Sequence, residues 1–194
     1  VALGSFERNT LDIEKGLADL KVAQPDAIVM VGTYAPLAKF VKSAKAAGLT
    51  KTLFHTVSFV GPEAFAKELG DASGNVFVTQ VMPPFTDAAC TIGQEYIAAL
   101  KVLAPDATPT FPGFEAYANA KVLTVGLQRS GKDLSVPTLL KSIESITPEN
   151  ELGLQLSYSA SDHEGLDAVF ITKIGSSGYE IVKDWGALKI AGLK

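Results

Sequence analysis

The sequence is poor in residues that carry covalent or redox chemistry. Among 194 residues there is one cysteine, Cys90, and there are two histidines, His55 and His163. A single cysteine excludes a disulfide within the chain, and neither histidine lies in a recognisable nucleophile signature. We therefore interpret Cys90 as a small apolar residue on a helix rather than as a catalytic thiol.

Known catalytic and cofactor motifs are also missing. The sequence contains no G-x-G-x-x-G, G-x-S-x-G or H-E-x-x-H and no paired-cysteine zinc motif. Residues 126–133 come near to the phosphate-loop pattern, but a helical pattern precedes them and Asp133 replaces the hydroxyl that would hold magnesium. A helix C-cap at Gly131 explains them better, and His163 with its acidic neighbours is interpreted as a solvated turn. We expect no enzyme activity, no cofactor and no metal.

Long apolar runs and an excess of positive charge are absent as well. The longest apolar stretches, such as residues 27–32, are far too short to span a bilayer. The net charge is −4, which argues against a nucleic-acid partner because such a partner favours a basic face. The first residue is Val1 and no signal-peptide pattern follows. We therefore expect a fragment or a processed chain.

Hydrophobic residues make up 47% of the chain and charged residues 20%, which predicts a folded protein with a real core. Over the first 82 residues, short apolar runs alternate with helical patterns. This order predicts a parallel sheet covered by helices on both faces. The predicted strands are residues 1–5, 27–31, 52–55 and 76–81, with 27–31 fully buried. The predicted helices are one capped by Asn9 or Thr10, one from Pro36 to Gly48 and one from Pro62 to Gly70.

The pattern changes at Pro83 and Pro84, because two consecutive prolines cannot continue a central strand. Three helical segments follow, at residues 88–103, 114–129 and 136–146, with no strand between them, so this block needs another surface to pack on. The tail returns to strands at residues 154–158, 168–174 and 179–182. A Gly-Ser-Ser-Gly sequence predicts a hairpin between the last two.

Several segments, in this order, resemble the second lobe of leucine/isoleucine/valine-binding proteins. They include Pro-Asp-Ala-Ile-Val-Met-Val-Gly-Thr-Tyr-Ala-Pro at residues 25–36, Val-Thr-Gln-Val at 78–81 and Phe-Glu-Ala-Tyr at 114–117. Shorter matches are Ala-Ala-Gly-Leu, Phe-Val-Gly, Leu-Gly-Asp and Asp-His-Glu-Gly, at residues 46–49, 59–61, 69–71 and 162–165. The order of these landmarks is the specific part of the resemblance.

The resemblance implies an α/β fold: a parallel-sheet lobe of a two-lobed type I periplasmic binding protein, plus a helical block of the other, mostly absent lobe. In that arrangement residues 1–82 form most of ligand-binding lobe two. Residues 83–150 form a crossover and helices of lobe one, and residues 151–194 a third crossover with returning strands. The opening strand and helix of lobe two are expected to be missing.

The expected ligand site lies beyond the carboxyl ends of the strands, where sheets of this kind bind ligands. By the resemblance, Tyr34 contacts the polar end of the ligand, and Ser58 occupies the position that normally holds an acid for the ligand ammonium. Using Glu63 as that acid would require a slip of five residues. Thr33, Phe59 and Met82 complete the expected site. For Tyr34 the alternative is a helix cap facing solvent, and for Phe59 and Met82 it is simple core packing.

The serine at position 58 has a chemical consequence. A buried ammonium without a counter-charge is costly, and a hydroxyl cannot replace the missing charge. We therefore expect a ligand without an obligatory α-ammonium, such as an aromatic or aliphatic carboxylate, with an amino acid as the alternative that the resemblance leaves open.

The expected function is that of an extracytoplasmic solute receptor that closes on its ligand and docks on an ABC permease. Its further partner is the missing N-terminal part or another chain, which should cover apolar faces of the helical block. Two alternatives stay open: a ligand sensor of the same fold in a signalling receptor, and a flavodoxin-like enzyme, which would need a phosphate-binding turn.

Overall fold

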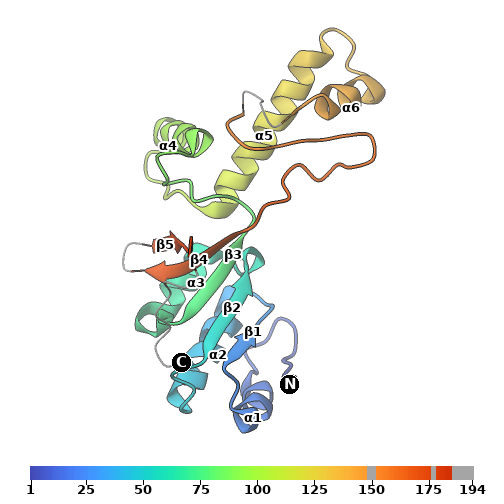
Figure 1. The fold of residues 1–194 in the computed structure, drawn as a ribbon. Helices are drawn as coiled ribbons and strands as arrows, with labels where there is room; N and C mark the ends of the chain where they lie inside the picture. The colour runs from blue at the N-terminus through green and yellow to red at the C-terminus, as the bar shows by residue number, and fades with distance from the viewer. Residues whose placement is uncertain (148–151, 176–177, 185–194) are drawn as a thin grey trace. The chain divides into compact units, whose positions relative to one another are not determined.

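A computed structural model of the chain describes residues 1–147, 152–175 and 178–184 (Figure 1). The chain forms two compact units, one of Val1–Gln80 with Phe170–Lys194 and one of Val81–Val169. Within the described ranges, no helix is long and apolar enough to cross a membrane.

The first unit is built on a mixed five-stranded sheet with the strand order β1-β2-β3-β4-β5. The first three strands are parallel, while β4 is antiparallel to β3 and β5 is antiparallel to β4. This confirms the predicted α/β fold and the predicted hairpin, although Ser176 and Ser177 of its turn lie outside the described residues. The strands are β1 (Ala27–Val29), β2 (Leu53–Val57), β3 (Val76–Gln80), β4 (Phe170–Gly175) and β5 (Gly178–Ile181).

The predicted helices precede and connect the parallel strands: the first precedes β1, and the other two connect β1 to β2 and β2 to β3. They are α1 (Glu14–Ala23), α2 (Tyr34–Ala46) and α3 (Pro62–Leu69), with short 3-10 turns η1 (Ser58–Val60) and η2 (Gly70–Ser73). Pro36 and Pro62 lie in first turns, where a missing N–H costs nothing. Gly48 and Gly70 follow the helix ends with φ of 102° and 52°, which glycine adopts without strain.

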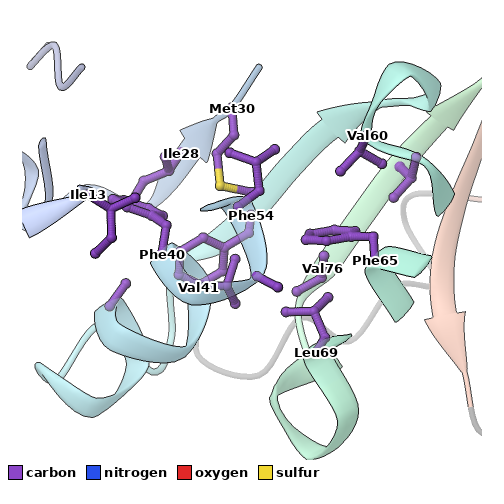
Figure 2. Close-up of a cluster of buried hydrophobic side chains, with 14 of the residues drawn as sticks. Ile13, Ile28, Met30, Phe40, Val41, Phe54, Val60, Phe65, Leu69 and Val76 are labelled. Carbon is purple, nitrogen blue, oxygen red and sulfur yellow. The ribbon is translucent and has the colours of Figure 1, made fainter. Parts of the chain in front are cut away.

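One face of the sheet and the helices α2 and α3 form the core of this unit (Figure 2). The strand residues on that face alternate in sequence, as the two-residue period of a strand requires. Phe54 of the central strand β2 is fully buried among them. The sheet contributes Ile28, Met30, Phe54, Val76 and Val78, and the helices contribute Phe40, Val41, Phe65 and Leu69.

The other face of the sheet is open at β1, where the prediction that helices cover both faces is wrong. Val29 is 75% exposed and Val31 is 69% exposed, so the prediction that residues 27–31 form a fully buried strand is wrong. β1 is an edge strand that pairs only with β2. Since Ile28 and Met30 alone face the helices, the segment is buried on one side only.

Two further predicted strands and one predicted cap are wrong. Residues 1–5 and 154–158 run without strand pairing, although Leu154 and Leu156 are buried. Alternation of apolar residues marks burial, but a strand also needs a partner strand, and neither segment has one among the described residues. Ile13 rather than Asn9 or Thr10 precedes the first turn of α1, while the Thr10 hydroxyl donates to the Glu7 carbonyl in a local turn.

The second unit contains three helices and no strand in its described part: residues 83–147 are without a strand as predicted, whereas the strand predicted at 154–158 is absent. The helices are α4 (Thr91–Leu103), α5 (Phe111–Ser130) and α6 (Val136–Glu144). Phe85 lies against Tyr96, Phe111 and Phe114, with ring centroids 5.2 to 6.0 Å apart. Gly131 ends α5 at a φ of 63°, which confirms the C-cap interpretation. Asp133 accepts hydrogen bonds from the Ser135 amide and the Thr138 hydroxyl instead of lying in a phosphate loop.

The one-sided core gives a direct test with two truncations in adjacent strands. Phe54→Ala should lower the free energy of unfolding by about 3–5 kcal/mol, because it opens a cavity under α2 and α3. Val29→Ala should change it by less than about 0.5 kcal/mol, because this side chain is already in solvent. Urea unfolding of both variants measures the difference, and equal losses would show that both faces of the sheet are covered.

Candidate functional site

The carboxyl ends of β1 and β2 bring two of the predicted contact segments to one edge of the sheet, because the strands are parallel. The chain leaves β1 through Met30, whose amide donates to the His55 carbonyl at 2.8 Å. Thr33 is extended, and its carbonyl accepts from the Leu37 amide at the start of α2. Its hydroxyl makes no capping hydrogen bond. Tyr34 is therefore the first helical residue and is 44% exposed.

The end of β2 turns directly into η1. Gly61 closes this turn with a φ of 78°, and its amide donates to the Ser58 carbonyl at 3.2 Å. Val60 is buried, Ser58 is half-buried and Phe59 is 69% exposed. A Cβ atom on Gly61 would lie 3.8 Å from Cδ1 of Tyr34, so the tyrosine ring lies beside the turn that carries Ser58.

An open depression of about 820 Å³ lies at the end of β1 and brings Thr33 and Phe59 together, whereas Tyr34 and Ser58 are not among its lining residues. Its other wall comes from the segment before α1, which the sequence analysis treated only as a helix cap. Arg8 adds a positive charge to this wall, a contribution that sequence reasoning missed because a lone arginine in a loop carries no distinctive spacing. The lining consists of Phe6, Arg8, Asn9, Thr10, Leu11, Val31, Gly32, Thr33, Ala35, Pro36 and Phe59.

Met82, the fifth predicted contact, belongs to the second unit. It is buried at 6% exposure and lines a cavity of about 170 Å³ within that unit, together with Glu115, Asn119 and Tyr158. Burial raises the pKa of the Tyr158 phenol. The core-packing interpretation therefore describes Met82 within its own unit, and its contact with a ligand stays a prediction.

The remaining titratable groups have ordinary partners. Burial lowers the pKa of His55, whose Nε2 lies 2.6 Å from the Thr79 hydroxyl, so the imidazole is held neutral. Burial also raises the pKa of the Cys90 thiol, which disfavours the reactive thiolate. His163 is exposed and lies 3.2 Å from a Glu144 carboxylate oxygen. In the part of the chain that the structure describes, no three His, Cys, Asp or Glu residues gather as a metal site.

A depression at the carboxyl ends of parallel strands lies where α/β sheets bind ligands. The sequence pattern of the family described as periplasmic binding protein matches residues 3–179. The chain belongs to this family, which confirms the resemblance inferred from the sequence. Members of the family are solute-binding proteins. No curated protein sequence matches the chain.

Solved structures support the same assignment. A possible leucine/isoleucine/valine-binding protein from Rhodopirellula baltica SH 1 is 30% identical, with a TM-score of 0.86 over 96% of this chain and 50% of its own. A leucine-binding protein from Thermotoga maritima is 15% identical, with a TM-score of 0.77 over 91% and 49%. A solute-binding protein of an ABC transporter from R. palustris, solved with benzoate, is 13% identical, with a TM-score of 0.73 over 91% and 48%. The last two show the fold alone, and the chain spans about half the length of each.

The turn beside Tyr34 can be tested through its left-handed glycine. Gly61→Ala should lower the free energy of unfolding by about 1–2 kcal/mol, because a Cβ atom is strained at this φ. Gly74→Ala is the matched control: its φ is −55° and the nearest neighbour of the added Cβ would be 3.9 Å away. The control should be neutral or stabilising by up to about 1 kcal/mol. Thermal unfolding that ranks the two variants in the opposite order would contradict the described turn.

Proposed function

We propose that the chain is part of the extracytoplasmic solute-binding component of an ABC transporter and that it binds a small carboxylate between two lobes. The protein acts in the periplasm or outside the cell, carries out no catalysis and delivers its ligand to a membrane permease. Membership of the periplasmic binding protein family supports this proposal, as does the similarity to the benzoate-bound transporter protein. The observation that carries it is the edge at Tyr34 and Ser58.

The ligand preference follows from the charges of the depression lined by Thr33 and Phe59, which are the sequence neighbours of Tyr34 and Ser58. None of the residues that line the depression is acidic, while Arg8 supplies a positive charge. Ser58 offers a hydroxyl where an α-ammonium would need a carboxylate. A carboxylate ligand gains a charge-assisted hydrogen bond from such a surface, whereas an ammonium would lose its hydration without compensation.

Glu63 is the competing source of an acid, and its surroundings argue against that role. It lies in the first turn of α3, and its charge acts on Tyr179 of β5. Burial, chiefly, and then the nearby Glu63 charge raise the pKa of that phenol, whose hydroxyl donates to the Pro62 carbonyl at 2.6 Å. The Glu63 carboxylate thus lies near the Tyr179 phenol of β5, and the resemblance puts Ser58 rather than Glu63 at the ligand position.

A second candidate function is a ligand-sensing domain of the same fold in a signalling receptor. The Tyr34 and Ser58 edge is compatible with both functions, because a transporter receptor and a sensor both bind a ligand and close on it. A permease that is stimulated by the ligand-loaded protein in reconstituted vesicles would support the transporter function, and an output domain in the same gene would support the sensor.

The function also requires a partner for surfaces that the chain leaves open. Val102 and Leu103 at the end of α4 are 80% and 84% exposed, and Val29 of β1 is equally uncovered. Neighbouring structures are about twice as long as this chain. We propose that polypeptide beyond these 194 residues, N-terminal in sequence or supplied by another chain, covers these faces and completes the second wall of the site.

The uncovered surfaces predict the behaviour of the 194 residues alone. Exposed apolar patches drive association, so sedimentation velocity should show concentration-dependent oligomers. Val102→Ser with Leu103→Ser should shift the distribution toward monomer, whereas the same double change at exposed Ala88 and Ala89 should not. A wild-type chain that stays monomeric at all concentrations would contradict the proposed partner surface.

The ligand preference predicts a specificity switch in the longer protein that contains these residues. Calorimetry should show binding of benzoate and no binding of leucine. Ser58→Glu should reverse this preference: leucine should gain about 10- to 100-fold in affinity from a charge-assisted hydrogen bond, and benzoate should lose affinity through repulsion.

The control for this switch is Ser161→Glu, which adds the same charge at an exposed turn in the other unit. It should leave both affinities unchanged. If the unsubstituted protein binds leucine tightly and shows no binding of benzoate, the ligand assignment is wrong, although the binding function would still stand.

A further inference from the structure

Two polar side chains on the buried face of the sheet have no hydrogen-bond partner among the described residues. They are Thr56, through its Oγ1, and Gln80, through both Nε2 and Oε1. Both residues are 0% exposed. Burying a hydroxyl and an amide without partners is costly, so native structures almost always provide partners for such groups.

The strand register makes these two residues neighbours. Thr56 pairs with Val78 and Val57 pairs with Thr79, so Gln80 lies two residues beyond the partner of Thr56 on the adjacent strand. The two-residue period of a strand puts Thr56 and Gln80 on the same face as Phe54 and Val78. Diagonal neighbours of this kind are within reach of each other when one side chain is long.

The adjacent strand supplies an internal comparison. Thr172 of β4 pairs with Val78 from the other side and is also fully buried. Its hydroxyl donates to the Val78 carbonyl at 2.9 Å. Two threonines therefore flank the same residue on the same face, one with a protein partner and one without.

We propose that Thr56 and Gln80 together hold one buried water molecule. The hydroxyl and the amide offer donors and acceptors to a single water, which needs two to four polar partners to be retained in an interior. The site is shielded from solvent, since Val60 and Phe65 above this face are 1% and 0% exposed. Solutes cannot reach this buried site. Thr56 and Gln80 therefore have a structural role.

The water would brace the turn that carries Ser58 and Phe59. Thr56 lies two residues before Ser58 in β2, and η1 packs against β3, the strand that ends at Gln80. A water that links the end of β2 to the end of β3 would fix the position of this turn relative to the sheet. This inference concerns the fold of the chain and stands whether or not the proposed ligand is correct.

The first test compares two identical substitutions by thermal unfolding of the 194-residue chain. Thr56→Val should lower Tm by about 2–4 °C, because it removes one partner of the bound water. Thr172→Val should also lower Tm, because it removes a hydrogen bond that is already made. If Thr56→Val raises Tm, the hydroxyl is an unpaired group in a dry core and the proposal is wrong.

The second test separates a water from a direct bond between the two side chains. A high-resolution crystal structure should place one water within about 3 Å of the Thr56 hydroxyl and the Gln80 amide. A direct Thr56–Gln80 hydrogen bond, or no density between them, would overturn the proposal.

The third test reads the position of the turn. Hydrogen exchange of the Gly61 amide, which donates to the Ser58 carbonyl, should accelerate in Thr56→Val relative to the mean of the β3 amides. It should not do so in Thr172→Val. Equal acceleration in both variants would show that the site has no local effect on the turn.

Discussion

The parallel register of β1, β2 and β3 is the constraint on which the rest of the first unit depends. Parallel strands require helical crossovers, and here α2 and α3 both cross the same face of the sheet. The main hydrophobic cluster therefore forms on that face, while Phe77 of β3 is buried on the other face. The same register brings the carboxyl ends of β1 and β2 to one edge. The residues that follow the two strands are therefore close together.

This register determines where the residues of the candidate site lie. Tyr34 is held because α2 begins directly after the β1 turn, and Ser58 is held because β2 ends in a 3-10 turn closed by a left-handed glycine. The contact between the Tyr34 ring and Gly61 joins the two connections. The depression that Thr33 and Phe59 line contains Arg8 and no acidic residue, which favours an anion over a cation.

The sequence predicted the elements whose signals are local. Proline at a first turn, glycine after a last turn and apolar residues at helical spacing located α2 and α3, and short apolar runs located β2 and β3. The sequence alone could not predict which segments pair as strands over long range. Residues 1–5 and 154–158 have the alternation of strands, yet pairing depends on which segments meet in space. Residues 27–31 are apolar throughout, and only the position of β1 at the edge of the sheet shows that Val29 is exposed.

For the site, the resemblance supplied Tyr34 and Ser58, and the structure brings their two segments together. The approach of Tyr34 to Gly61 and the place of Arg8 in the depression could not be predicted, because both depend on how separate loops pack. The same holds for Thr56 and Gln80. Each is an ordinary strand residue in the sequence, and only the register shows that two unpaired polar groups share one buried face.

The central claim is that the edge formed by Tyr34 and Ser58 binds a carboxylate. A crystal structure of the longer protein, grown with sodium benzoate, tests it most directly. We expect this structure to show a carboxylate group within hydrogen-bond distance of the Tyr34 and Ser58 hydroxyls and no acidic side chain in contact with the ligand. A ligand bound away from this edge, or one whose ammonium pairs with Glu63, would contradict it.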